Sequence, residues 1–165
     1  MIAAALEIPW VDITIHSTSA DLTAVQEKMN ELMGQAGWDP VADEKHFNAV
    51  WQALEEVLVN AAKHGNDMVS EQLIYISHHI NSETINISVK DSGPGFNPDK
   101  VADPTTDENL ERPSGRGLLL INHFATDVEY IPHPTNVGCT NHIRIIRHRN
   151  HDNIVEQRKA AMLED

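Results

Sequence analysis

The chain has 165 residues, a length that favours a single domain able to bury roughly 70% of the surface that its unfolded form exposes. Its 12 Lys and Arg against 25 Asp and Glu give a formal net charge of −13, which argues against a nucleic-acid surface and requires any anionic ligand to be received locally. No segment approaches the roughly 20 apolar residues of a membrane span, and a single cysteine with no leader-like start predicts a cytosolic protein in a reducing compartment.

The first expected elements are a strand and an amphipathic helix. Residues 10–17 alternate apolar and polar side chains, which is the period of a half-buried strand. After possible N-caps at residues 17–19, apolar side chains recur at helical spacing as far as Gly37. We interpret this helix as structural, because its methionines fit a core better than a cofactor contact.

A second helix is expected over residues 43–65, with one stripe of apolar side chains along it. At 100° per residue, Glu56 lies roughly opposite the centre of that stripe, with Asn60 and Lys63 beside it. His64 lies on the flank of the same polar face. Periodicity alone favours an ordinary solvated face over a functional one, since Glu and Lys are common on exposed helices.

Residues 73–80 and 84–91 predict two strands joined as an antiparallel hairpin. Asp91 falls in the phase of the apolar side chains of the second strand, so its carboxylate is expected on the buried side, where it needs a hydrogen-bonding partner. Gly93 and Gly95 follow directly and would let the backbone approach a ligand closely. A tight turn leaving the strand explains these glycines equally well.

The stretch of residues 97–115 is polar and interrupted by prolines, and it is longer than the roughly 12 to 15 residues usual for a structureless loop, which is typical of a lid. Gly115, Arg116 and Gly117 then open an apolar helix over residues 118–124. Backbone amides, a helix dipole and a guanidinium therefore converge at one point and could cradle a phosphate. The spacing is not that of a Walker A loop, which needs a lysine that is absent here.

The last third of the chain predicts two more strands, over residues 127–133 and 139–147. Asn141 occupies a position in the second strand where an apolar residue is usual. Residues 148–165 are polar, with loose helical spacing that fits a short helix or a frayed tail. We find no internal repeat and no clear linker, so residues 1–147 are expected to form one domain.

Three separate motifs resemble, in order, the N, G1 and G2 boxes of the GHKL ATPase superfamily, which includes gyrase, histidine kinases and mismatch-repair ATPases. Residues 63–65, 115–118 and 127–130, together with the short chain, are similar to the anti-sigma-factor serine kinases of sporulation and general-stress control. One glycine box would be weak evidence, but three in the expected order and context are strong evidence. The motifs are Glu56-x-x-x-Asn60-Ala61-x-x-His64-Gly65, Asp91-x-Gly93-x-Gly95 and Gly115-Arg116-Gly117-Leu118.

The resemblance implies the Bergerat ATP-binding fold, a two-layer α/β sandwich with helices on one face of a mixed, mostly antiparallel sheet. By the same resemblance, Asn60 binds Mg²⁺ through its amide oxygen, Asp91 accepts a hydrogen bond from the adenine amino group, and Glu56 is the general base. The cofactors it implies are ATP and Mg²⁺. The other nucleotide-binding residues that it implies are Lys63, His64, Gly93, Gly95, Gly115, Arg116, Gly117, Leu118 and Thr140.

The function implied is that of an anti-sigma factor that phosphorylates a small antagonist protein on serine, with a sigma factor as its other partner and a homodimer as its assembly. One alternative is a nucleotide-dependent binding module that sequesters a partner without kinase activity. Glu56 favours the kinase, although Glu55 could shift the register by one. A histidine kinase catalytic domain is a third alternative, but only about 40 residues, opening with a strand, precede the helix over residues 43–65, which leaves no helical hairpin to carry a phosphoacceptor histidine.

Overall fold

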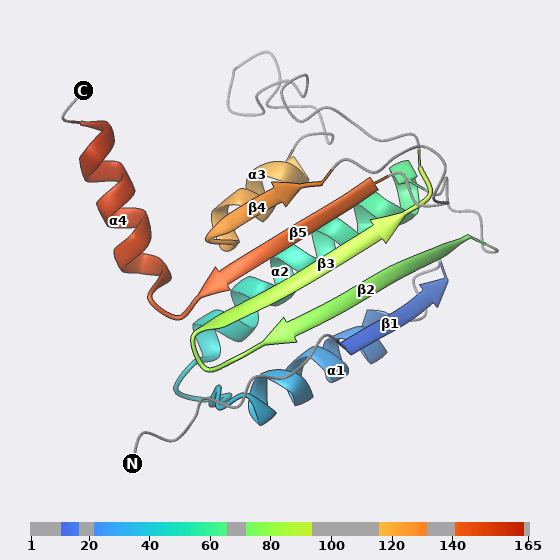
Figure 1. The fold of residues 1–165 in the computed structure, drawn as a ribbon, viewed down its shortest axis with the longest axis horizontal. Coiled ribbons are helices and arrows are strands. Elements are labelled where there is room, and N and C mark those ends of the chain that lie inside the picture. Colours follow the sequence, from blue (N-terminus) through green and yellow to red (C-terminus); the bar gives the residue numbers. More distant parts are fainter. Residues whose placement is uncertain (1–10, 17–21, 66–71, 94–115, 132–140, 164–165) are drawn as a thin grey trace.

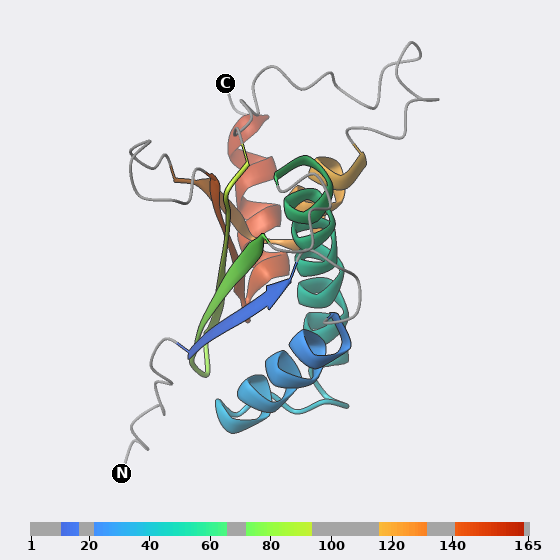
Figure 2. The ribbon, with the colours of Figure 1, turned by 90° about the vertical axis from the view of Figure 1, so that its right-hand side faces the viewer.

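The computed structural model describes residues 11–16, 22–65, 72–93, 116–131 and 141–163. These residues form two layers, a five-stranded sheet and a set of helices packed on one of its faces (Figure 1, Figure 2). The two-layer α/β fold predicted from the sequence is therefore confirmed. The elements in chain order are β1 (Val11–His16), α1 (Leu22–Gln35), α2 (Glu44–Asn60), the π-helical turn η2 (Ala61–Gly65), β2 (Leu73–Ile80), β3 (Thr84–Asp91), α3 (Arg116–Phe124), β4 (Asp127–Tyr130), β5 (Asn141–His148) and α4 (His151–Met162).

The sheet has the strand order β1-β2-β3-β5-β4, and each neighbouring pair is antiparallel. β2 and β3 have the bounds that alternation predicts, and they pair as the expected hairpin. The sequence leads us to expect a mixed sheet, but no parallel pair occurs among the described strands. The reason is topological: β3 and β4 run in the same direction, but β5 lies between them and is antiparallel to both.

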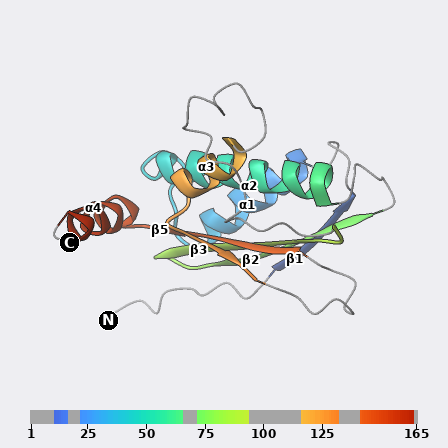
Figure 3. The same ribbon diagram turned by 90° about the horizontal axis from the view of Figure 1, so that it is seen from above.

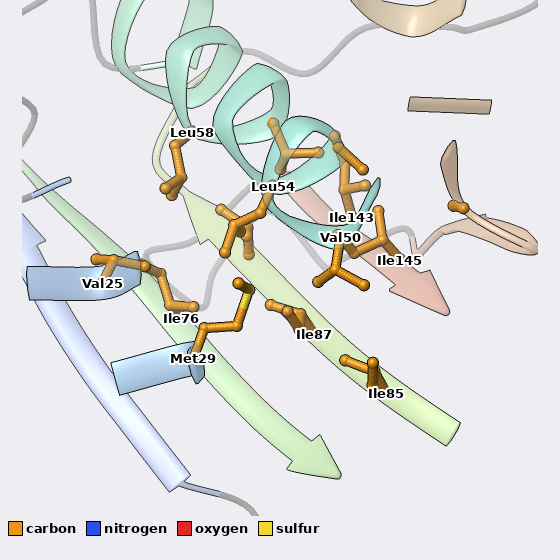
Figure 4. Close-up of a cluster of buried hydrophobic side chains, with 14 of the residues drawn as sticks. Val25, Met29, Val50, Leu54, Leu58, Ile76, Ile85, Ile87, Ile143 and Ile145 are labelled. Carbon is orange, nitrogen blue, oxygen red and sulfur yellow. The ribbon is translucent and has the colours of Figure 1, made fainter. Parts of the chain in front are cut away.

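The core lies between the sheet and helices α1, α2 and α3. α2 is the central helix of its layer, and its buried Val50, Leu54 and Leu58 face the isoleucines of the sheet (Figure 4). Met29 and Met33 of α1 are fully buried in the same core, which confirms the structural reading of the first helix. Burial of apolar side chains at about 25 cal/mol per Å² is the main term that holds such layers together.

The opposite face of the sheet is polar, and no described helix covers it (Figure 3). There Arg144 of β5 donates from Nη1 to Glu129 of β4 at 3.1 Å and from Nε to Ser88 of β3 at 3.3 Å. Alternation of apolar and polar side chains along these strands therefore separates a buried face from a solvated one. In the described parts of the chain, no helix is both long and apolar enough to span a membrane.

α4 extends beyond the end of the sheet (Figure 1, Figure 3). Arg158 donates to the carbonyl oxygen of Thr126 at 2.8 Å and pairs with Asp127 at 2.8 Å, while Asp152 accepts from Lys45 at 2.7 Å. Asp152 in its first turn and Lys159 in its last also complement the helix dipole. Of the two possibilities left open for residues 148–165, a helix and a tail, the helix is therefore the one found.

The N-terminal end of α2 is held by a cluster centred on Arg149, which we call the Arg149 cluster: Arg149, Asp43, Trp38, Asn81 and Ser82. Arg149 Nη1 donates to both carboxylate oxygens of Asp43 at 2.9 Å, and Nε donates to the Ser82 carbonyl at 2.6 Å. The guanidinium carbon lies 3.9 Å from the centroid of the Trp38 ring, whose Nε1 donates to the Asn81 carbonyl at 2.7 Å. One side chain thus joins the start of α2 to the β2–β3 hairpin.

Candidate functional site

The polar face of α2 lies beneath the start of α3. Glu56 and Asn60 stand one turn apart on this face, and both side chains are half-buried. A Cβ atom added to Gly117 would lie 2.8 Å from Glu56 Oε2 and 3.4 Å from Asn60 Nδ2, so any side chain at this position would displace the Glu56 carboxylate. The interpretation of this polar face as an ordinary solvated one, which periodicity alone favours, is therefore wrong at this turn. Glu55 is exposed, which identifies Glu56 as the acid that faces α3.

α3 begins at Arg116, so the N-terminal end of this nine-residue helix lies beside Glu56 and Asn60. The first amides of a helix have no partner within it and carry the positive end of its dipole, which suits a phosphate group. The Leu118 side chain packs against the core, so this residue would meet a ligand through its backbone amide. Arg116 is exposed at the same helix end.

The C-terminal end of α2 widens into a π-helical turn. The α-helix ends at Asn60, and residues 61–65 form η2, in which hydrogen bonds run from i to i+5. The prediction that Lys63 lies beside Glu56 and Asn60 assumes α-helical spacing, which η2 does not keep, so the position of Lys63 relative to these two side chains stays a prediction. Lys63 is exposed, and the His64 side chain lies outside what the structure describes. π-helical turns within helices recur at functional sites.

Asp91 is the last residue of β3 and is 5% exposed, in the buried phase that alternation predicts. Its Oδ1 accepts hydrogen bonds from the Gly93 amide at 2.8 Å and from Asn141 Nδ2 at 2.6 Å. Burial raises the pKa of this carboxyl, and the two hydrogen bonds act in the opposite direction without cancelling it. No described cation pairs with Asp91, and the two described donors to this carboxylate are neutral.

The site therefore combines two groups of residues. η2 packs against β3, so the Asn60 end of α2 adjoins the strand that carries Asp91 (Figure 1). The acid and amide of α2, the N-terminus of α3 and the carboxylate at the end of β3 gather around one end of the helix layer. Among the described residues, the structure brings Gly117, at the start of α3, onto Glu56 and Asn60, and Gly93 onto Asp91; the packing of η2 on β3 is the contact between these two groups.

Other predicted residues lie outside the described ranges: Gly95, Gly115 and Thr140. The expected lid over residues 97–115 lies outside them too. The binding and catalytic roles assigned to all these residues by resemblance stay predictions.

The described residues do not form a metal site that is complete without a substrate. Nowhere in residues 11–16, 22–65, 72–93, 116–131 and 141–163 do three or more His, Cys, Asp or Glu side chains gather in a way that could hold an ion. Asn60 offers a single amide oxygen. This donor set fits Mg²⁺, a hard cation that commonly takes one or two protein ligands and completes its shell with water and the phosphates of a substrate.

Asn141 is a member of this site whose role sequence reasoning missed. It begins β5, pairs in register with Asp91, and supplies one of the two hydrogen bonds on that carboxylate. The signal was present in the sequence as a polar residue at an expected strand position, but only the pairing of β3 with β5 shows which group it serves.

Comparison with known families gives a match over most of the chain. Residues 15–152 match the family described as Histidine kinase-like ATPase domain. An anti-sigma F factor of Bacillus cereus (strain G9842) is 32% identical over 108 residues, which cover 64% of this chain and 71% of that protein. An anti-sigma F factor of Bacillus thuringiensis (strain Al Hakam) matches with the same identity and coverage.

A similar fold occurs in the crystal structure of the RsbU and RsbW domains of Rv1364c from Mycobacterium tuberculosis. The TM-score is 0.57 at 17% sequence identity, and the match covers 86% of this chain and 32% of that one. At this identity the likeness bears on the fold alone.

Proposed function

Because this chain belongs to the histidine kinase-like ATPase family and has anti-sigma factors among its relatives, we propose that it is an ATP-dependent protein-serine kinase. It would act as an anti-sigma factor and phosphorylate a small antagonist protein on serine, with Mg-ATP as the phosphoryl donor. The observation that carries the proposal is the close approach of Gly117 in α3 to Glu56 and Asn60 in α2. That approach joins a candidate base and a candidate metal ligand to a helix N-terminus suited to phosphate.

Each residue then has a separate task. Asn60 holds Mg²⁺ through its amide oxygen, and the ion, when bound, neutralises charge on the phosphates. The amides at the start of α3 orient the phosphates of the substrate. Asp91 accepts a hydrogen bond from the adenine amino group, and Gly93 lets the backbone lie close to the base. Positioning and charge neutralisation of this kind supply most of the rate enhancement in phosphoryl transfer.

Glu56 serves as the general base that takes the proton from the serine hydroxyl of the antagonist. A positioned base of this kind contributes about 10²- to 10⁴-fold to a rate. The partners proposed are the antagonist and a sigma factor, and the assembly proposed is a cytosolic homodimer.

The test is incubation of the full chain with Mg-ATP and a candidate antagonist, with phosphoserine measured by mass spectrometry. Glu56→Gln keeps the shape of the side chain under Gly117, so we expect nucleotide affinity to persist while the transfer rate falls about 10²- to 10⁴-fold. Glu55→Gln is the matched control, because Glu55 is the exposed neighbour and should transfer at the parent rate.

Equal transfer rates in Glu56→Gln and the parent chain would remove Glu56 from the role of base. ATP binding without any phosphoserine on a bound antagonist would favour the alternative, a nucleotide-dependent module that sequesters its partner.

A further inference from the structure

The feature that the proposed function leaves unexplained is the side chain of Asn141. It is the first residue of β5 and pairs directly with Asp91 across the β3–β5 ladder. Residues two and four further along the strand, Ile143 and Ile145, are buried in the core, so Asn141 stands at an apolar phase of the strand. A polar side chain at such a position needs a specific partner, and Asp91 is that partner.

The hydrogen bonds on Asp91 are asymmetric. The Gly93 amide and Asn141 Nδ2 both donate to Oδ1, at 2.8 Å and 2.6 Å. No described residue donates to Oδ2. One donor comes from the turn that follows β3 and the other from a neighbouring strand, so the carboxylate is fixed from two directions. Oδ2 is left as the acceptor with an unfilled hydrogen-bonding capacity.

We propose that Asn141 is a positioning residue for base recognition: by fixing Oδ1 of Asp91, it presents Oδ2 to the exocyclic amino group of a 6-aminopurine. The inference rests on the proposed nucleotide site. A 6-oxopurine places a carbonyl acceptor against the same oxygen, and an unsubstituted purine offers no donor. Asn141 thereby gives the site its preference for adenine without touching the nucleotide.

A purely structural role for Asn141 predicts something different. If Asn141 only provided a hydrogen bond to a buried carboxylate, its loss would lower the stability of the protein or lower the affinity for all nucleotides by the same factor. A positioning role instead changes the ratio of affinities between purines that differ at position 6. That ratio is therefore the readout that separates the two roles.

The experiment measures the affinity of the full chain, with Mg²⁺ present, for ATP, inosine triphosphate and purine riboside triphosphate by calorimetry. In Asn141→Val we expect ATP affinity to fall about 10-fold, the worth of one ordinary hydrogen bond, with the two analogues nearly unchanged. Asn141→Ala, which adds no apolar branch, should give the same loss of selectivity and serves if the valine variant does not fold. Asn86→Val is the matched control, because Asn86 is a half-buried asparagine of β3 whose hydrogen bond, among the described residues, goes to the nearby Thr84.

The outcomes distinguish the role of Asn141 from the existence of the nucleotide site. Failure of the parent chain to bind ATP at all would reject the nucleotide site itself. A parent chain that prefers ATP, with the same preference retained in both Asn141 variants, would overturn the role of Asn141 alone. An equal loss of affinity for all three nucleotides in the Asn141 variants would also overturn the positioning role. A collapse of selectivity in the Asn141 variants, with Asn86→Val unchanged, supports it.

Discussion

The two ends of the helix layer each carry a carboxylate, and the pKa values of these two groups are shifted in opposite directions. At the N-terminal end of α2, burial works to raise the pKa of Asp43, but the hydrogen bond from the Asp39 amide and the guanidinium of Arg149 together hold that pKa below its ordinary value. At the other end, burial dominates and raises the pKa of Asp91, because its donors among the described residues, Asn141 and Gly93, are both neutral. One end is arranged for stability. The other carries a buried charge with neutral partners, a feature that is costly unless a ligand uses it.

The largest effect is expected for Asp91→Asn. The amide keeps Oδ1 as an acceptor for Gly93 and Asn141 but places a donor where the adenine amino group also donates. We expect ATP affinity to fall by on the order of 10²-fold or more. The stability of the ligand-free protein should rise by about 1 kcal/mol, or about 2–4 °C in Tm, because a buried charge is removed.

The sign of the stability change follows from linkage. A carboxyl whose pKa is raised in the fold contributes stability below its unfolded pKa, and that contribution is lost as the pH rises through the folded value. The gain from Asp91→Asn should therefore be present at pH 7 and disappear near pH 3, by thermal melts in the absence of nucleotide. A lower Tm at pH 7 together with retained ATP binding would contradict the comparison.

The opposite pattern is expected for Arg149→Met. Loss of the guanidinium removes the cation that pairs with Asp43 and the Nε donor to the Ser82 carbonyl, and we expect the free energy of unfolding to fall by about 2–3 kcal/mol with ATP affinity unchanged. Arg158→Met is the matched control, because the Arg158 side chain is 52% exposed in its pair with Asp127 and should cost under about 1 kcal/mol. Denaturant titration measures both. Equal losses of unfolding free energy in the two variants would mean that the Arg149 cluster contributes no more to stability than an exposed ion pair.

A smaller and more selective effect is expected for Gly117→Ala. The new methyl group would meet Glu56 Oε2 at 2.8 Å, the far end of a flexible side chain that can move aside. Stability should hold or rise slightly, since Ala favours a helix over Gly by about 0.5–1 kcal/mol. Displacing the carboxylate should lower the phosphoserine transfer rate by roughly 10-fold.

Gly34→Ala is the control for this substitution. Gly34 lies in α1, and nothing stands within 4 Å of the position that its Cβ would take. It should gain the same helix stability without any change in transfer rate. A transfer rate in Gly117→Ala equal to that of Gly34→Ala would mean that the approach of α3 to Glu56 does not matter for catalysis.

The sequence predicts the β2–β3 hairpin and the buried position of Asp91, but it does not predict the Arg149 cluster. Residues 73–80 and 84–91 are predicted as strands with the bounds that β2 and β3 have, and the spacing of Ile85, Ile87 and Val89 places Asp91 on the buried face. The Arg149 cluster escapes prediction, since Arg149 lies 106 residues from Asp43 and 67 residues from Ser82 in the chain and meets them only in the fold.

The candidate site shows the same limit. Helical spacing predicts that Glu56 and Asn60 share a face, but the start of α3 that lies over them is distant in the chain, at Gly117. The π-helical turn after Asn60 could not be predicted, because the spacing of the apolar side chains along the helix does not indicate it. The partnership of Asn141 with Asp91 needs the register of β3 with β5, which the sequence does not state.

We propose that the polar face of α2 under α3 holds Mg-ATP, and this claim requires Asn60 for binding of the metal-nucleotide complex. Calorimetric titration of ATP into the full chain, with and without Mg²⁺, should show that Asn60→Ala lowers affinity about 10-fold or more when Mg²⁺ is present. Asn48→Ala, at an exposed asparagine of the same helix, should bind as the parent chain does. An Mg-ATP affinity for Asn60→Ala equal to that of Asn48→Ala would contradict the claim.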